Sequence, residues 1–312
     1  MIELRNITKK FGSLTAVDDL SLEIGPGEIY GFIGPNGAGK STTMKILACL
    51  LRPDSGHASV GGHDVRTQGP AIRRILGYMP DFLGVYDDLT VDEYLQFFAA
   101  AFAIPRGKRR ATIDGVLELT DLTEKKNAMV SSLSRGMQQR LGVARVLIHD
   151  PKVLLLDEPA SGLDPRARIE MRELLVELRK MGKVLMVSSH ILTELAEMCS
   201  SIGIIERGKL IYSGSIRDAY ERVRTGDRLS VLLENPEPPT LARAEAALKG
   251  DERIRSVATE DGRLEIELLK DQRSHHFIIE LLVNAGVRIE SFHAREVKLE
   301  DAFLKLTKGA VQ

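Results

Sequence analysis

The stretch Gly34-Pro35-Asn36-Gly37-Ala38-Gly39-Lys40-Ser41 decides the fold of this chain. It matches G-x-x-x-x-G-K-[ST], a loop whose backbone N–H groups cradle phosphates. The apolar run Glu28–Ile33 before it predicts a buried strand, and Ser41–Leu51 after it carries apolar residues at helical spacing. The glycines let the backbone form an anion nest at a helix start. The sequence therefore predicts a nucleoside triphosphate site, with Lys40 along the β- and γ-phosphates and Ser41 on Mg²⁺.

Length and composition set the outer limits. At 312 residues the chain exceeds the usual size of one core, which favours two domains, and its hydrophobic content of 43% supports a real core. The net charge of −1 gives no reason to expect nucleic acid as a partner. The N-terminus lacks a signal-peptide pattern, and the apolar run Tyr94–Ile104 is too short to span a bilayer. We expect a soluble protein whose membrane role, if any, comes through a partner.

A second apolar run ends in two acids. Val153–Leu156 has the continuous apolar pattern of a strand buried on both faces, and Asp157 and Glu158 follow it directly. Two solvated acids at a strand end are the plain alternative, which the P-loop upstream disfavours. Asp157 suits the Mg²⁺ role of the acid after such a strand, and Glu158 suits a general base that polarises the attacking water.

Three further residues stand where they could meet a nucleotide. Phe11 lies in the alternating strand pattern of residues 2–24 and could stack on adenine, although an edge-strand core residue is the alternative. Ser134 is placed to cap a helix and so offers a second anion-binding helix end. His190 follows the apolar strand Val184–Val187 and could reach a γ-phosphate, although a lone histidine is usually structural.

The segment between these motifs predicts helices. Thr90 is a plausible N-cap for an amphipathic helix that stops at Pro105, and residues 112–120 suggest another helix. The basic run Arg106–Arg110 could meet lipid phosphates or a partner, but we favour a solvated loop.

Read in order, these motifs resemble the ATP-binding subunits of ABC transporters over about residues 1–220. In that family the order is an adenine-stacking aromatic residue, the P-loop, a glutamine loop, a signature, an Mg²⁺ acid with a catalytic glutamate, a D-loop and a switch histidine. The matching positions are Phe11, Gly34–Thr42, the segment ending at Asp81, Leu133–Gln138, Asp157 with Glu158, Ser161–Asp164, and His190.

The resemblance assigns site residues. It implies nucleotide contacts from Phe11, Gly34, Pro35, Asn36, Gly37, Ala38, Gly39, Lys40, Ser41, Thr42, Ser134, Gly136 and Asp164. It implies catalytic roles for Lys40, Asp81, Glu158 and His190, and Mg²⁺ ligands in Ser41, Asp81 and Asp157.

The resemblance also implies an assembly. We expect an α/β P-loop ATPase with an antiparallel β subdomain and a helical subdomain, using ATP and Mg²⁺. Two copies would form a head-to-tail homodimer, in which Ser134 and Gly136 of one subunit contact the γ-phosphate held by Lys40 of the other. The dimer would drive a separate integral membrane permease from the cytoplasmic face of the cell membrane. The closing Leu299–Leu304 looks like the tail of exporter ATPases for drugs, sodium ions or polysaccharides.

Two positions depart from the family pattern. The usual Leu-Ser-Gly-Gly-Gln reads Leu133-Ser134-Arg135-Gly136-Met137 here. Asp81 stands where the family has a glutamine that contacts Mg²⁺ and the attacking water. Because Asp81 adds negative charge near Asp157 and Glu158, it should disfavour ionisation of one acid. We hypothesise slower or differently Mg²⁺-dependent hydrolysis.

The pattern changes after the ATPase motifs, so we place the domains at 1–222 and 223–312. The second domain predicts the order β-α-β-β-α-β, a split βαβ module of small α+β type, followed by a helix at Leu299–Leu306. Its His275, His276 and His293 could suggest a metal, but solvated or core histidines fit better. The domain is either a dimer clamp or regulatory cap, or a simple packing strut.

Two rival functions stay open beside the exporter ATPase. DNA-repair or chromosome-organising ATPases share the P-loop and signature, but they carry long coiled coils between the two, and residues 52–132 show no heptads. An ATP-sensing module without transport is conceivable because of Asp81. This sequence does not identify the transported substance, because selectivity would reside in the permease.

Overall fold

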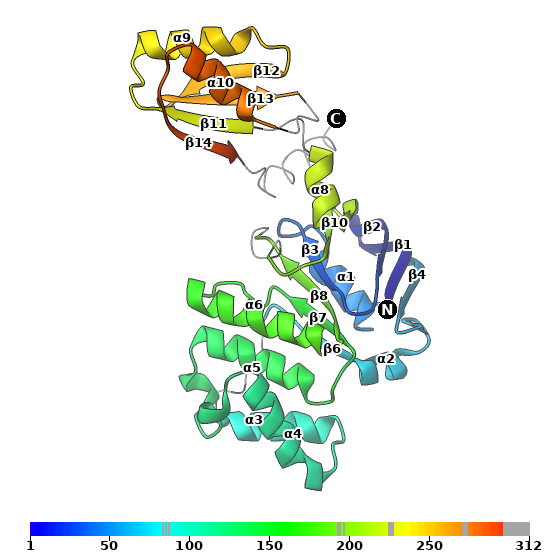
Figure 1. Cartoon of the computed structure of the whole chain (residues 1–312). Coiled ribbons are helices and arrows are strands. Elements are labelled where there is room, and N and C mark those ends of the chain that lie inside the picture. Colours follow the sequence, from blue (N-terminus) through cyan, green and yellow to red (C-terminus); the bar gives the residue numbers. More distant parts are fainter. Residues whose placement is uncertain are drawn as a thin grey trace. The chain divides into compact units, whose positions relative to one another are not determined.

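The computed structural model describes residues 1–82, 84, 86, 88–191, 195, 197–223, 228–269 and 274–295 (Figure 1). Contacts divide the chain into two compact units, the first from Met1 to Ile216 and the second beginning at Arg217. Within the described ranges, no helix is long and apolar enough to cross a membrane.

The first unit contains an antiparallel sheet built from its N-terminal residues. The strand order is β2-β1-β4-β5. The bounds are β1 (Ile2–Phe11), β2 (Leu14–Ile24), β4 (Ser55–Val60) and β5 (His63–Asp64). The predicted alternation of residues 2–24 is confirmed, because it buries one face of this sheet.

A mixed six-stranded sheet forms the centre of the first unit. Its order is β10-β9-β3-β8-β7-β6, in which β10 runs antiparallel to β9 and the other neighbours run parallel. The bounds are β3 (Ile29–Ile33), β6 (Leu76–Met79), β7 (Val153–Asp157), β8 (Val184–Ser189), β9 (Ser201–Glu206) and β10 (Lys209–Ser215). β3, β7 and β8 are buried along their whole length, as their apolar runs predict. Their carboxyl ends therefore meet at one edge.

Helices cover this sheet and extend beyond it. Figure 1 shows α3, α4 and α5 gathered on the side of the edge strand β6. The bounds are α1 (Lys40–Leu47), α2 (Gly69–Ile75), α3 (Val91–Ala101), α4 (Arg106–Leu119), α5 (Arg135–Leu147) and α6 (Pro165–Lys180), with short 3-10 turns at Thr123–Lys125 and Val130–Ser132. α8 (Ile216–Val223) begins at the last residue of the first unit and continues into the second. One apolar core joins α1 to both sheets.

Helix boundaries show where sequence patterns succeed and fail. The Thr90 cap is confirmed: its side chain accepts the Glu93 N–H, and the Glu93 carboxylate accepts the Thr90 N–H. The loop predicted for Arg106–Arg110 is wrong, because α4 begins at Arg106, whereas the predicted solvation is confirmed by the exposure of Arg106, Lys108 and Arg110. Pro105 precedes this helix at the N-cap, and arginine and lysine are good helix formers.

The second unit has the predicted order of elements. It runs β11 (Arg228–Leu233), α9 (Pro238–Lys249), β12 (Ile254–Glu260), β13 (Arg263–Leu268), α10 (His276–Asn284) and β14 (Ile289–Arg295). The strands form an antiparallel sheet of order β12-β13-β11-β14, and the two helices pack with it around a separate apolar core. The split βαβ module is therefore confirmed. The predicted helix at Leu299–Leu306 and the tail Leu299–Leu304 lie outside the described residues.

Candidate functional site

The loop between β3 and α1 has a backbone that only glycine permits at its crowded points. Gly39 has φ 111° and precedes the first residue of α1, and a Cβ there would lie 2.5 Å from the Ala16 carbonyl oxygen. A Cβ at Gly34 would lie 2.3 Å from the Ile205 carbonyl oxygen. Only glycine therefore fits at positions 34 and 39, because the backbone of another segment lies so close to each. The loop ends at the start of α1, where free backbone N–H groups can bind an anion.

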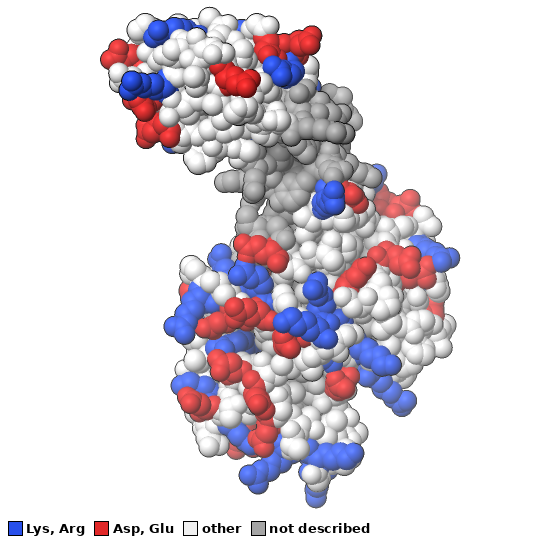
Figure 2. Space-filling model, in the orientation of Figure 1, with Lys and Arg blue, Asp and Glu red and all other residues white. Residues whose placement is uncertain are grey.

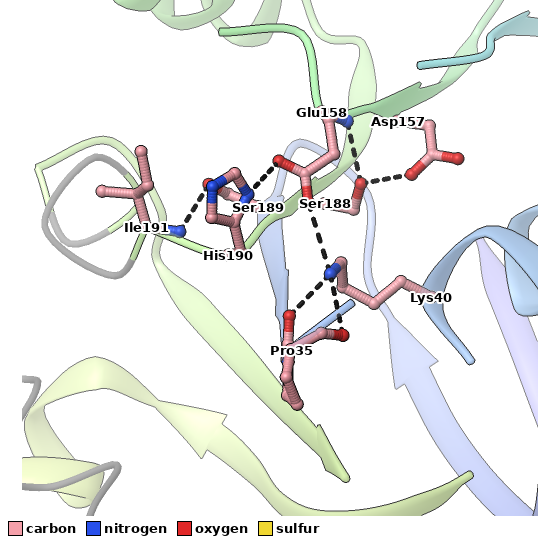
Figure 3. Close-up of polar contacts among 9 residues, drawn as sticks. Pro35, Lys40, Asp157, Glu158, Ser188, Ser189, His190 and Ile191 are labelled. Atoms are coloured by element: carbon pink, nitrogen blue, oxygen red, sulfur yellow. Dashed lines mark hydrogen bonds and ion pairs between the residues drawn. The ribbon is translucent and has the colours of Figure 1, made fainter. Parts of the chain in front are cut away.

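Lys40 is buried beneath this loop with its charge compensated. Its Nζ donates to the carbonyl oxygen of Gly34 at 2.6 Å and of Pro35 at 3.4 Å (Figure 3). The same nitrogen lies 3.3 Å from Glu158 Oε1. A buried ammonium needs such partners. Lys40 therefore links the P-loop directly to the acid after β7.

Glu158 occupies the centre of this arrangement. Its Oε2 lies 2.8 Å from His190 Nδ1, at the carboxyl end of β8. Its Oε1 is buried, and it accepts no hydrogen bond from any residue that the structure describes. Glu158 thus faces Lys40 with one carboxylate oxygen, Oε1, and His190 with the other, Oε2.

A cavity of about 330 Å³ adjoins these groups. It is lined by P-loop residues from Pro35 to Thr42 together with Phe11, Asp81 and Glu158. Phe11 is 47% exposed, and Lys9 Nζ lies over its ring, 5.4 Å from the centroid. The fold therefore brings together five stations that lie far apart in the sequence: the aromatic residue, the P-loop, Asp81, Glu158 and His190.

Asp81 titrates abnormally in this setting. Burial raises the pKa of its carboxyl group, and the nearby negative charges of Asp157 and Glu158 raise it further. Arg135 and His190 act in the opposite direction. The direction agrees with the expectation that a third acid here makes ionisation of one of them harder.

Ser134 and Asp164 cap helices away from that cavity. Ser134 Oγ accepts the Met137 N–H at 3.3 Å to start α5, as predicted, and Asp164 Oδ1 accepts the Ala167 N–H at 3.0 Å to start α6. Neither belongs to the described side chains that line the cavity. These two helix starts lie side by side, because a Cβ on Gly162 would meet the Arg135 guanidinium.

Ser188 is a site residue that sequence reasoning missed. It is fully buried in β8, and its hydroxyl contacts both acids at the end of β7. The available signal was a serine at the end of an otherwise apolar strand, where a buried hydroxyl requires partners.

Comparisons with known proteins give the family. The model of the ABC transporter domain matches residues 17–161. The uncharacterised ABC transporter ATP-binding protein YhcH of Bacillus subtilis is 36% identical over 98% of this chain and 96% of its own length. The chain belongs to the ATP-binding proteins of ABC transporters. It is an ATPase that binds ATP as a transporter subunit, which confirms the predicted family and activity.

Other ABC ATP-binding proteins match just as completely. The linearmycin resistance ATP-binding protein LnrL of B. subtilis is 30% identical over 98% of both chains. The Nod factor export ATP-binding protein I of Burkholderia thailandensis is 34% identical over 100% of this chain and 98% of that one. Both alignments extend through the second unit.

Solved ABC cassettes share the fold of the ATPase part. CbiO1 from Clostridium perfringens superposes with a TM-score of 0.65 and 26% identity, covering 72% of this chain and 92% of its own. The dimeric cassette MJ0796 superposes with a TM-score of 0.63 and 27% identity, covering 70% of this chain and 99% of its own. The predicted P-loop α/β fold is confirmed.

Proposed function

We propose that this ABC ATPase is the ATP-hydrolysing subunit of an exporter. Two copies close on two ATP molecules, and hydrolysis reopens them to drive a separate integral membrane permease. The subunit works on the cytoplasmic face of the membrane, held there by that permease. Export is the direction we favour because relatives that align over the whole chain carry Nod factor export or linearmycin resistance in their names.

One observation carries the dimer: the signature residues Ser134 and Gly136 are not among the described residues that line the cavity at the P-loop. They lie at the start of α5, beside the D-loop. A head-to-tail pair supplies what each copy lacks, because the α5 helix start of one subunit then faces the γ-phosphate held by the other. Ser161–Asp164 would lie in the same interface.

The geometry supports a division of labour in hydrolysis. Lys40, already beneath the loop, donates to the phosphates once ATP fills the cavity. Glu158 accepts the proton of the attacking water as general base, because its carboxylate adjoins the cavity beside the P-loop. His190 holds the other carboxylate oxygen and senses the γ-phosphate. Phe11 stacks on adenine at the rim.

The oxygen donors around the cavity suit Mg²⁺. Ser41 and Asp81 line it, and Asp157 ends β7 directly before Glu158, which also lines it. Mg²⁺ is commonly held by one or two carboxylates together with substrate phosphates, so a complete protein cage is not needed. Such an ion would neutralise developing charge on the phosphates. Asp81, in place of glutamine, adds negative charge to this site. We propose that hydrolysis is therefore slower or depends differently on Mg²⁺.

An exposed aromatic patch supports a protein partner for the helical subdomain. Phe82 is 85% exposed, Tyr86 52% and Phe97 51%, and the rings of Tyr86 and Phe97 lie 5.7 Å apart between centroids. Exposed aromatic residues that lie close to one another mark interaction sites. We assign this patch to the permease. Tyr86 lies in the chain segment after Asp81 and Phe97 lies in α3, so their contact joins that segment to the helical subdomain.

The second domain, 223–312, is proposed as a dimer clamp or regulatory cap, with a packing strut as the alternative. Its own core and complete sheet support an independently folded module. The charged surface in Figure 2 mixes Lys and Arg with Asp and Glu across the visible face of the first unit, without a basic stripe. The charges on that face therefore do not support the DNA-repair alternative. The ATP-sensing alternative rests on Asp81.

A trapped dimer tests this proposal. Glu158→Gln keeps the shape but loses the base, so we expect ATP binding, hydrolysis lower by at least about 100-fold, and accumulation of an ATP-bound dimer on size-exclusion chromatography. Glu177→Gln, on the exposed face of α6, is the matched control with unchanged turnover. Unreduced hydrolysis in Glu158→Gln removes the assignment. Co-purification with a hydrophobic membrane protein separates the exporter from both rivals.

A further inference from the structure

Ser188 lies where two parallel strands end together. In the register of the central sheet, Asp157 of β7 is paired with Ser188 of β8. Ser188 is 0% exposed, and Asp157 is 2% exposed. A hydroxyl in that position has lost water and must find its hydrogen bonds inside the protein.

One hydroxyl serves both acids of the site. Ser188 Oγ donates to Asp157 Oδ1 at 2.6 Å and accepts the backbone N–H of Glu158 at 2.9 Å (Figure 3). A serine hydroxyl has one hydrogen to give and two lone pairs to receive, so both contacts are satisfied at once. Ser188 thereby couples the carboxylate of one acid to the main chain of the next.

The main chain at Glu158 needs such a restraint. Glu158 has φ 52°, in the left-handed region that is uncommon for residues other than glycine. Pro159 follows it and further restricts its backbone. The left-handed turn directs the Glu158 carboxylate toward Lys40 and His190, away from the contact that Asp157 makes. The Ser188 bond to the Glu158 N–H holds the chain in this conformation.

We infer that Ser188 is a positioning residue for ATP hydrolysis. Its hydroxyl fixes the rotation of the Asp157 carboxylate and the backbone of Glu158 in a single arrangement. The inference rests on the proposed roles of Asp157 and Glu158. It goes beyond them because Ser188 itself acts on neither ATP nor water. Groups that orient metal ligands in this way commonly contribute 10- to 100-fold to affinity or activity.

Kinetics of three variants test the inference. Ser188→Ala removes both contacts, and we expect kcat to fall about 10-fold or more while KM for ATP stays within about twofold. Ser188→Thr keeps the hydroxyl and should restore most of kcat. Ser188→Cys has similar volume but a weak hydrogen-bonding group, and it carries the test if Ser188→Ala does not fold.

Nucleotide binding without turnover separates positioning from packing. ATP affinity measured in EDTA should match the parent in Ser188→Ala, whereas the Mg²⁺ concentration needed to strengthen binding should rise about 10-fold. Thr120→Val is the control: Thr120 is also buried, and its hydroxyl donates to the Val116 carbonyl oxygen in α4. It should lower thermal stability without changing kcat or the Mg²⁺ requirement.

The outcomes separate the two levels of the claim. If the parent hydrolyses ATP, Glu158→Gln is inactive and Ser188→Ala keeps the parent kcat and Mg²⁺ requirement, the positioning role is overturned alone. It is also overturned if Thr120→Val lowers kcat as much as Ser188→Ala does. If Glu158→Gln turns over normally, the proposed site roles fall first.

Discussion

The six-stranded central sheet of the first unit and the four-stranded sheet of the second unit differ in the polar groups that are buried beside them. In the first unit, Lys40, Asp157, Glu158 and Ser188 are all buried at one edge of the central sheet. Within the described part of the second unit, Ser230 is the buried polar residue, and ion pairs such as Lys249–Glu245 lie at the surface. This difference distinguishes the first unit, which carries a candidate catalytic site, from the second unit, which is held together by apolar packing.

Sheet topology explains the difference. Five parallel strands of the first unit end at the same edge, so loops after β3, β7 and β8 deliver their side chains to one place. In the antiparallel sheet of the second unit, neighbouring strands end at opposite edges. Burying charge costs free energy unless it is paired. The first unit therefore pairs the charges that it buries at this edge, Lys40 with Glu158, and the nucleotide site that we propose accounts for their position there.

Replacing one buried or paired cation in each unit should give the largest difference in ATP hydrolysis between the two units. Lys40→Met removes the charge beneath the P-loop, and we expect ATP hydrolysis to fall by at least about 100-fold. Arg253→Met in the second unit loses a bond to Asp251 and a stacking contact with Phe277, but turnover should stay near that of the parent. Phosphate release measures both. Equal losses would contradict the contrast.

The next largest effect should be on thermal stability, because the two units have separate cores. Ile266→Ala leaves a cavity in the core of the second unit and should destabilise that unit by about 2–5 kcal/mol. Calorimetry should then show an early transition that ATP does not move and a later one that ATP raises, because only the first unit binds the ligand. One transition that ATP shifts as a whole would show that the units unfold together.

Much of this contrast could be predicted from the sequence. The P-loop spacing, the apolar run before Asp157 and the Thr90 cap are local patterns, and each carries its own physical signal. The role of Ser188 could not be predicted, since its contacts depend on the register of strands about thirty residues apart. α2 and the start of α4 were missed because neither carries a strong apolar periodicity.

The Asp81 position sharpens the comparison within the first unit. Asp81→Gln removes one of three clustered acids and provides the amide that the family uses. We expect turnover to rise several-fold and the Mg²⁺ optimum to shift, because less negative charge then surrounds the phosphates. Asp261→Asn, in the turn between β12 and β13, is a matched carboxylate control in the second unit. An unchanged rate and Mg²⁺ profile would exclude Asp81 from the mechanism.

The smallest expected effect is a pH-dependent one on stability. The pKa of Asp81 is raised in the folded protein, chiefly by burial and then by Asp157 and Glu158. The folded state therefore binds this proton more tightly than the unfolded state does. The contribution of Asp81 to stability thus falls as pH rises from its ordinary value, about 3.9, through the raised one.

Replacing Asp81 with asparagine removes that penalty. At pH 7 we expect Asp81→Asn to raise the free energy of unfolding of the first unit by a few tenths of a kcal/mol, since Asp81 is only partly buried and solvent screens its charge. The gain should shrink as pH falls through the raised pKa and vanish at about pH 3, below the ordinary value of about 3.9. Urea unfolding at both pH values measures it. A gain that persists at low pH would mean that packing, and not charge, distinguishes Asp81 from its replacement.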